Sequence, residues 1–110
     1  MTSRINKQMI EELKDIMEED FPLLIDTFIT DSDKRLNDLQ LAVSQQNAVS
    51  IRELAHGFKG SSSNLGAEKL AEISFSLETM GRTEQLVAAE NTLKDLADEY
   101  KIVHEYFKSL

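Results

Sequence analysis

The sequence lacks several features that mark particular classes of protein. It contains no cysteine among its 110 residues, so it can form neither disulfide bonds nor thiolate metal sites, which suits a reducing compartment. Its N-terminal segment has no uninterrupted apolar core of the kind that a signal peptide needs. Its hydrophobic content of 41% is spread too evenly to form a membrane span. We therefore expect a single globular domain over residues 1–110, located in the cytoplasm.

Positive charge is scarce as well. The chain has 12 Lys and Arg residues against 20 Asp and Glu residues, and its formal net charge is -8. Nucleic-acid binding depends mainly on cations that meet phosphate groups. The charge therefore argues against nucleic acid as a partner, and equally against an anionic membrane surface.

Signals for β-strands are missing, because no alternating run of apolar residues lies between Asn-Gly or Asp-Gly turns. Apolar residues recur instead at helical spacing. The expected helices run from Asn6 to Glu18, from a cap at Asp20 to about Val43, from Ala48 to about Asn64, from Ala67 to Met80, and from Thr83 to the end of the chain. This pattern predicts an all-α fold, an antiparallel four-helix bundle with an additional short N-terminal cover helix.

Single residues indicate where these helices begin and end. Pro22 is tolerated in the first turn of the second helix, and Asn47 is a good N-cap for the third. Gly66 and Gly81 are the expected C-terminal stops of the third and fourth helices. The last helix should be the longest, at about 40 Å for a rise of 1.5 Å per residue.

The segment most suggestive of chemistry runs from Ala55 to Ala67 and reads AHGFKGSSSNLGA. At about 100° per residue, His56 lies more than a right angle from the apolar stripe of its helix, so it should face solvent or a partner. Lys59 and Gly60 follow at i+3 and i+4, beside His56 on the same surface. Gly57 and Gly60 each cost a helix about 1 kcal/mol relative to alanine. This context favours a histidine that carries a charged group, with Lys59 neutralising a phosphoryl oxygen and Gly60 leaving room for a second protein.

Other functional sites fit the sequence less well. Glu53 and His56 have the E-x-x-H spacing of di-iron bundles, but Lys101 stands where a second copy, ending at His104, would need its glutamate. No G-x-x-x-x-G-K-[ST] phosphate loop occurs, so the chain lacks an ATP site of its own. We predict no metal site and no bound cofactor. His104 lacks a glycine-rich context, and we expect it to be a boundary residue on the flank of the last helix.

At the Ala55–Ala67 segment the sequence resembles the histidine-containing phosphotransfer (HPt) domain family. The residues that match its H-x-x-K-G-S-S-x-x-L-G-A signature are His56, Lys59, Gly60, Ser61, Ser62, Leu65, Gly66 and Ala67. The residues that fit the family's next helix and its end are Leu70, Ile73, Leu77, Glu78 and Gly81. The recognisable motif covers residues 47–82, and Ser74 stands where the family usually has cysteine or another small residue.

The resemblance implies that His56 is reversibly phosphorylated, receiving the phosphoryl group from a receiver-domain aspartate and passing it to another. Lys59 would then stabilise the phosphoryl charge, and Gly60 would permit access. The expected docking residues around this site are Gly57, Ser63, Phe75 and Leu23. The expected partners are response-regulator receiver domains, which would supply Mg²⁺, and a hybrid sensor histidine kinase. We expect the protein itself to be a monomer.

Two other classes of function remain open at this point. The same surface could bind and sequester a receiver domain without phosphotransfer, or the bundle could be purely structural. A structural role would leave the cost of Gly57 and Gly60 unexplained. Whether the chain counts as an enzyme stays open: phosphotransfer alone would not make it self-sufficient, because partner receivers are expected to supply much of the catalytic geometry. Both a stand-alone protein and a module of a hybrid kinase are compatible with the pattern.

Overall fold

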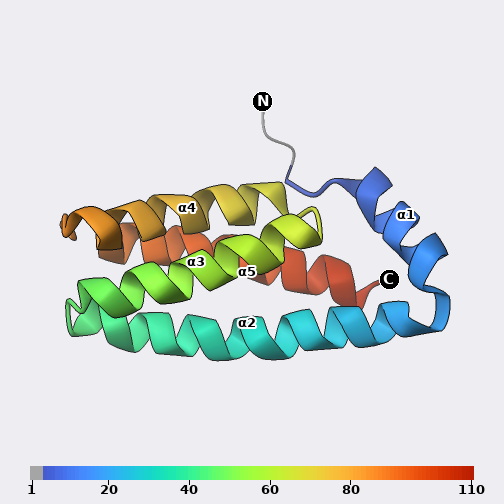
Figure 1. The fold of residues 1–110 in the computed structure, drawn as a ribbon, viewed down its shortest axis with the longest axis horizontal. Coiled ribbons are helices and arrows are strands. Elements are labelled where there is room, and N and C mark those ends of the chain that lie inside the picture. The colour runs from blue at the N-terminus through green and yellow to red at the C-terminus, as the bar shows by residue number, and fades with distance from the viewer. Residues whose placement is uncertain (1–3) are drawn as a thin grey trace.

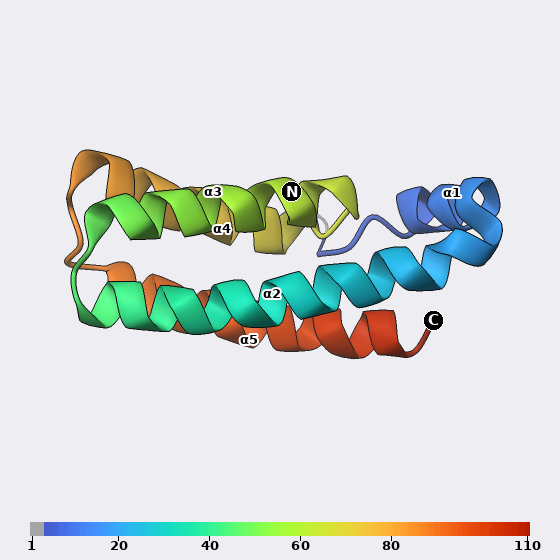
Figure 2. The same ribbon diagram turned by 60° about the horizontal axis from the view of Figure 1, so that its bottom comes forward.

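The structure is a computed structural model and describes residues 4–110. Within this range it is helical, without β-strands, as predicted. The elements in chain order are α1 (Lys7–Met17), a short 3₁₀ turn η1 (Glu18–Asp20), α2 (Phe21–Ser44), α3 (Ala48–Asn64), α4 (Glu68–Thr83) and α5 (Ala89–Lys108). Figure 1 shows α2 to α5 running lengthwise as a bundle, with α1 beyond the ends of α3 and α4. Figure 2 shows that α3 and α4 form one layer and that α2 and α5 form the other. The predicted four-helix bundle with an N-terminal cover helix is confirmed.

Aromatic rings from three helices meet in the core. Phe28 of α2 packs edge-on against Phe107 of α5, with ring centroids 5.4 Å apart. Phe58 of α3 packs edge-on against Tyr100 of α5 at 5.8 Å, and its side chain is fully buried. Phe58 fixes which side of α3 faces the core. Residues on the opposite side of this helix must therefore face outward. The core packing thus determines which face α3 presents to solvent.

Both ends of α3 form where the sequence predicts them. The Asn47 side chain accepts a hydrogen bond from the backbone N–H of Ser50, which caps the first turn. At the other end, Gly66 adopts φ +71°, a left-handed conformation that favours glycine and closes the helix. The bounds Ala48–Asn64 agree with the prediction because both signals act locally.

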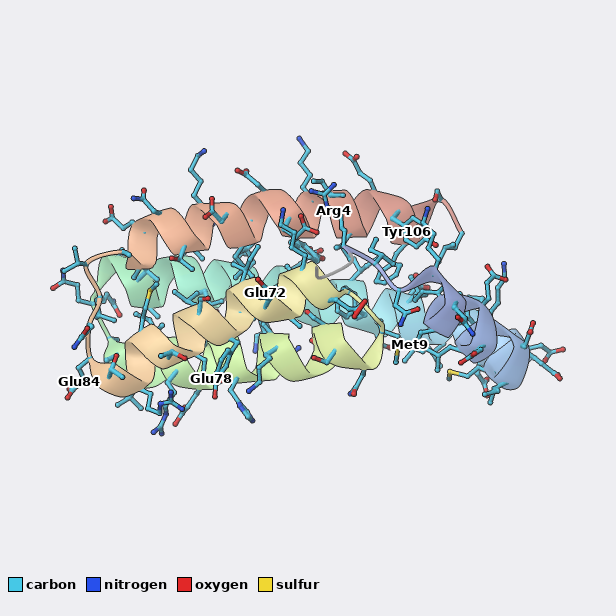
Figure 3. The ribbon with its side chains drawn as sticks, turned by 90° about the horizontal axis from the view of Figure 1, so that it is seen from above. Arg4, Met9, Glu72, Glu78, Glu84 and Tyr106 are labelled. Carbon is cyan, nitrogen blue, oxygen red and sulfur yellow. The ribbon has the colours of Figure 1, made fainter. Side chains whose placement is uncertain are left out.

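The N-terminal segment is tied to the same end of the bundle. The backbone N–H of Asn6 donates to the carbonyl of Gly66 at 2.8 Å. The Arg4 guanidinium donates to both carboxylate oxygens of Glu99, each at 3.1 Å, and Figure 3 shows Arg4 lying against α5. Glu99 is buried, so Arg4 compensates a charge that would otherwise be costly to enclose. These contacts hold residues 4–6 against the bundle, beside the connection between α3 and α4.

The predicted end of the fourth helix was wrong. Gly81 does not stop α4, which continues to Thr83 and ends at Glu84 with φ +57°. Gly81 is buried instead, and a Cβ added there would lie 2.7 Å from the carbonyl oxygen of Ala48 and 2.7 Å from the backbone nitrogen of Arg52. Glycine is therefore required for the close approach of α3 and α4, not for a turn.

The start and relative length of the last helix were also wrong. Thr83 belongs to α4, where its hydroxyl donates to the Thr79 carbonyl at 2.9 Å. The last helix, α5, begins at Ala89 and has 20 residues, whereas α2 has 24. Leu86 is apolar and in register with α5, yet it is half-buried from the connecting loop. Leu86 packs on the core from the loop and so continues the helical spacing of apolar residues beyond the start of α5. For this reason the prediction placed the beginning of the last helix too early in the chain.

The start of α2 differs from the prediction in one respect. Pro22 lies in the first turn as expected, but Asp20 makes no capping hydrogen bond with its side chain. The turn η1 leads directly into α2, so the backbone is already coiled before the helix begins. No helix within residues 4–110 is both long enough and apolar enough to cross a membrane.

Candidate functional site

His56 lies in the middle of α3 on the side opposite the core. Its side chain is 68% exposed, whereas Phe58 two residues later is fully buried. The outward orientation expected from the helical period is therefore confirmed. The imidazole is anchored on one edge and open to solvent on the other.

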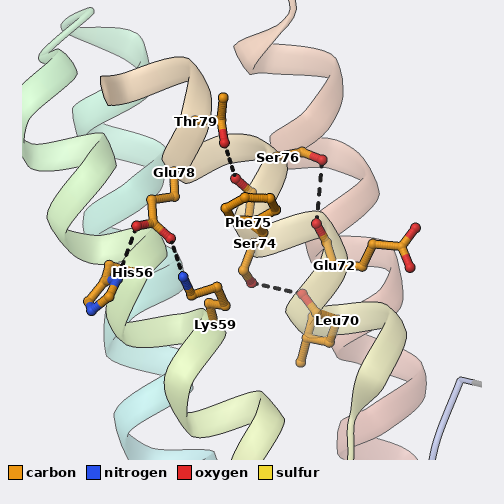
Figure 4. Close-up of polar contacts among 9 residues, drawn as sticks. All are labelled: His56, Lys59, Leu70, Glu72, Ser74, Phe75, Ser76, Glu78 and Thr79. Carbon is orange, nitrogen blue, oxygen red and sulfur yellow. Dashed lines mark hydrogen bonds and ion pairs between the residues drawn. The ribbon is translucent and has the colours of Figure 1, made fainter. Parts of the chain in front are cut away.

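Glu78 of α4 holds both His56 and Lys59 (Figure 4). One carboxylate oxygen, Oε2, lies 3.0 Å from Nδ1 of His56. The other, Oε1, lies 2.8 Å from Nζ of Lys59. The Glu78 side chain is only 13% exposed, because it fills the seam between α3 and α4, as Figure 3 also shows.

Glu78 is ionised at neutral pH. Its pKa lies below the ordinary value, chiefly because the Lys59 ammonium bonds to the carboxylate, and His56 lowers the pKa further. Partial burial acts in the opposite direction but does not prevail. A carboxylate can only accept hydrogen bonds, so Nδ1 of His56 must be the donor and must carry a proton. In the neutral imidazole this leaves the lone pair on Nε2, the nitrogen that Figure 4 shows on the ring edge turned away from Glu78.

Lys59 lies between Glu78 and an aromatic ring. Its ammonium stands 5.1 Å from the centroid of the Phe75 ring, and its side chain is 30% exposed. The sequence suggested an exposed cation, but the structure shows a half-buried one whose charge is already paired. An anion on His56 would therefore compete with Glu78 for Lys59.

The glycines of α3 differ in what surrounds them. A Cβ added at Gly57 would lie 3.0 Å from Nε of Arg35, which reaches across from α2. A Cβ added at Gly60 would meet no atom within 4 Å. Packing thus explains Gly57, whereas no intramolecular contact explains Gly60. The exposed surface one turn beyond His56 is bare backbone.

Of the four expected docking residues, three lie at the site and one lies apart; Gly57 is next to His56 and faces Arg35. Phe75 is 49% exposed and touches Lys59, and Ser63 is exposed on α3 beside a groove that Lys59 also lines. Leu23 is 66% exposed, but it precedes Arg35 by 12 residues on α2, or about 18 Å along a helix. Arg35 is the α2 residue that meets α3 beside His56, so Leu23 lies far from the histidine.

Glu78 is the functional residue that sequence reasoning did not assign to the site. It was recognised only as a match to the next helix of the HPt family. It stands 22 residues from His56 in the chain, and no periodicity within one helix can reveal a pairing between two. His104 conforms to its prediction as a boundary residue, since it is half-buried and its ring lies 5.9 Å from that of Tyr100. Residues 4–110 contain no group of three or more His, Asp or Glu side chains placed to hold one metal ion.

Comparisons with known proteins agree on one family. Residues 23–105 match the family model described as the Hpt domain. The chain is 28% identical over 86 residues to phosphorelay protein LuxU of Vibrio harveyi, covering 77% of this chain and 75% of that protein. It is 30% identical over 105 residues to histidine-containing phosphotransfer protein 1 of Arabidopsis thaliana, covering 92% and 68% respectively.

Solved structures show the same architecture. Histidine-containing phosphotransfer protein B (HptB) from Pseudomonas aeruginosa PAO1 superposes with a TM-score of 0.94 at 35% sequence identity, covering 99% of this chain and 95% of that one. Yeast Ypd1p superposes with a TM-score of 0.69 at 24% identity, covering 88% and 64%, and shares the fold.

Proposed function

This chain belongs to the Hpt domain family and serves histidine phosphotransfer in a two-component phosphorelay, and from that premise we propose that it carries the phosphoryl group on Nε2 of His56. The observation that supports this most is the contact of 3.0 Å between Nδ1 and the Glu78 carboxylate. That contact places the proton on Nδ1 and directs the lone pair of Nε2 into solvent, where a partner can reach it.

The transfer step follows from this arrangement. The Nε2 lone pair attacks the phosphorus of a partner's aspartyl phosphate, and the bond between phosphorus and the aspartate oxygen breaks. The electron pair leaves with the aspartate, which becomes a carboxylate. Nδ1 keeps its proton throughout, so the phosphorylated ring is a cationic imidazolium that the Glu78 carboxylate stabilises. In the reverse direction a partner's aspartate carboxylate attacks the phosphorus, and the bond between phosphorus and Nε2 breaks. The ring then leaves as the neutral imidazole with its proton still on Nδ1, so no proton has to move in either direction.

Lys59 would change partners during this step. The phosphoryl group brings negative charge next to an ammonium that is paired with Glu78 at 2.8 Å. Phosphate oxygens are strong acceptors of charge-assisted hydrogen bonds. Lys59 can therefore exchange its ion pair with Glu78 for one with the phosphoryl group, while Glu78 remains paired with the imidazolium of His56. The total charge of the cluster is then redistributed without leaving a buried charge unpaired.

Gly60 would provide the approach for the partner. It lies at i+4 from His56, on the same face, and its surface is open. A helix-disfavouring residue with no structural reason fits a position where a second protein must come close to the nucleophile.

The partners in this proposal are receiver domains of response regulators and of a hybrid sensor histidine kinase. Their active sites would supply the Mg²⁺ as well as the phosphorylated aspartate. The chain would act in the cytoplasm as a monomer. Support for receiver domains as partners comes from the relatives described as phosphorelay and phosphotransfer proteins and from the exposed histidine on α3.

A labelling experiment with two matched variants tests the proposal. The wild-type protein is incubated with a phosphorylated receiver domain, and acid-labile label is measured together with binding. His56→Gln should abolish the label and retain the helical circular dichroism, whereas His104→Gln should label normally. Label that persists in His56→Gln would overturn the assignment. Binding of the phosphorylated receiver by wild type without any label would favour sequestration over transfer.

A further inference from the structure

Arg35 of α2 occupies the space that Gly57 leaves open on α3. Measured from the position of a Cβ added to Gly57, the Arg35 guanidinium has Nε at 3.0 Å, Cζ at 3.5 Å and Nη2 at 3.6 Å. Gly57 is a helical residue without a left-handed φ, so its backbone gives no reason for glycine. Its missing side chain makes room for the guanidinium.

This guanidinium has no carboxylate partner among residues 4–110. Asp38 and Glu53 line the same surface groove as Arg35, yet neither forms an ion pair with it. Its one hydrogen bond is a long one of 3.5 Å to the hydroxyl of Ser61. In a chain with a net charge of -8, a half-buried arginine without an acidic partner is free to bind an anion from outside.

The position of Arg35 is opposite to that of Lys59. Viewed down α3, Lys59 lies about 60° to one side of His56, and Gly57 lies about 100° to the other side. Lys59 and Glu78 thus flank the histidine on the α4 side, and Arg35 flanks it on the α2 side. The Nε2 edge of the imidazole is turned away from Glu78 (Figure 4). A group bonded to Nε2 therefore lies beyond the ring edge that faces away from Glu78, with Lys59 to one side of it and Arg35 to the other.

We propose that Arg35 forms an oxyanion subsite on the α2 side of His56, which binds the phosphoryl group in transit. A guanidinium presents its N–H donors in a planar fork that matches two phosphoryl oxygens. The long contact to Ser61 costs little to exchange for such bonds, and Gly57 leaves the side chain room to move. The subsite rests on the proposed function, since it needs a phosphoryl group at His56.

Two phosphoryl donors and a matched control variant test whether Arg35 binds the phosphoryl group or the partner protein. Arg35→Gln is compared with Lys34→Gln, which removes the same charge from the neighbouring exposed residue of α2. One donor is a phosphorylated receiver domain, and the other is phosphoramidate, which is too small to need a docking surface. Arg35→Gln should slow labelling by both donors about tenfold or more, as the loss of a charge-assisted hydrogen bond predicts. Lys34→Gln should label like wild type, and Arg35→Lys should fall between the two.

Equal labelling rates for Arg35→Gln and Lys34→Gln with phosphoramidate would overturn the subsite. A defect confined to the receiver donor would overturn it too, because Arg35 would then bind the partner and not the phosphoryl group. If Arg35→Gln melts early, Gly57→Ala decides, since its Cβ displaces the guanidinium while favouring the helix. Gly57→Ala should label slowly, and normal labelling would overturn the subsite. Label that persists in His56→Gln would instead mean that the proposed function itself is wrong.

Discussion

Replacing Gly60 by glutamine should stabilise the protein and at the same time block phosphotransfer. Gly60 is an exposed residue inside α3, and a Cβ there would meet nothing within 4 Å. A longer side chain therefore introduces no clash, and the helix gains about 0.5–1 kcal/mol from the better propensity of glutamine. For a domain of this size the melting temperature should rise by about 2–6 °C.

The effect on transfer comes from the position of the new side chain. It would extend from the residue next to His56 on the exposed face, where the partner's aspartyl phosphate must approach to about 3–3.5 Å. A displacement of about 1 Å can cost about a hundredfold in rate, so we expect at least that loss from a phosphorylated receiver. Labelling by phosphoramidate should change little, because this donor does not need the partner surface.

Gly81→Ala is the matched control for a glycine with a packing role. Its Cβ would lie 2.7 Å from two backbone atoms of α3, so it should lower the melting temperature. Gly81 is buried in the seam between α3 and α4, so this substitution adds no side chain to the exposed surface beside Gly60. The reasoning on Gly60 would be refuted if Gly60→Gln transferred at the wild-type rate, or if it melted earlier than wild type.

Three further predictions concern the residues around His56. Lys59→Ala should slow transfer and shorten the phosphohistidine lifetime in a quenched time course, and it should cost about 1 kcal/mol of stability because Glu78 loses its main partner. An unchanged lifetime would make Lys59 a spectator. Phe75→Ala should weaken receiver binding in a titration without early melting, because the ring is 49% exposed and lies off the core. If Phe75→Ala instead melted as early as a variant with a cavity in the core, Phe75 would be a packing residue and not part of the docking surface. Glu78→Gln should lose less stability than wild type when the pH is lowered from 6 to 3. The pKa of Glu78 is lowered from 4.5 in the folded state. The ionised carboxylate therefore stabilises the wild-type fold above that value, and this stabilisation disappears as the pH falls. Equal losses for Glu78→Gln and wild type would contradict the lowered pKa.

The sequence predicts this fold best where a local signal acts alone. The cap at Asn47 and the left-handed Gly66 define α3 with the correct bounds, because each needs only its own turn of helix. The helical period likewise places His56 outward and Phe58 inward. These features depend on backbone geometry and on burial along one helix.

The features that the sequence did not predict depend on contacts between helices. Gly81 looked like a helix stop but is a packing requirement between α3 and α4. Glu78 and Arg35 reach the histidine surface from α4 and α2, and nothing in the spacing of either helix indicates that they meet α3 there. The spacing of apolar residues along one helix shows which face of that helix a residue occupies. It does not show which residue of another helix lies opposite.

The most direct measurement of the histidine chemistry is long-range ¹H–¹⁵N NMR of the ring nitrogens before and after phosphorylation. In the free protein, the shifts of His56 should show the proton on Nδ1 and the lone pair on Nε2, because Glu78 accepts from Nδ1. After phosphorylation, coupling to phosphorus should appear at Nε2 of His56 while Nδ1 stays protonated. A proton on Nε2 in the free protein, or phosphorus on Nδ1 or on His104, would contradict the proposed mechanism.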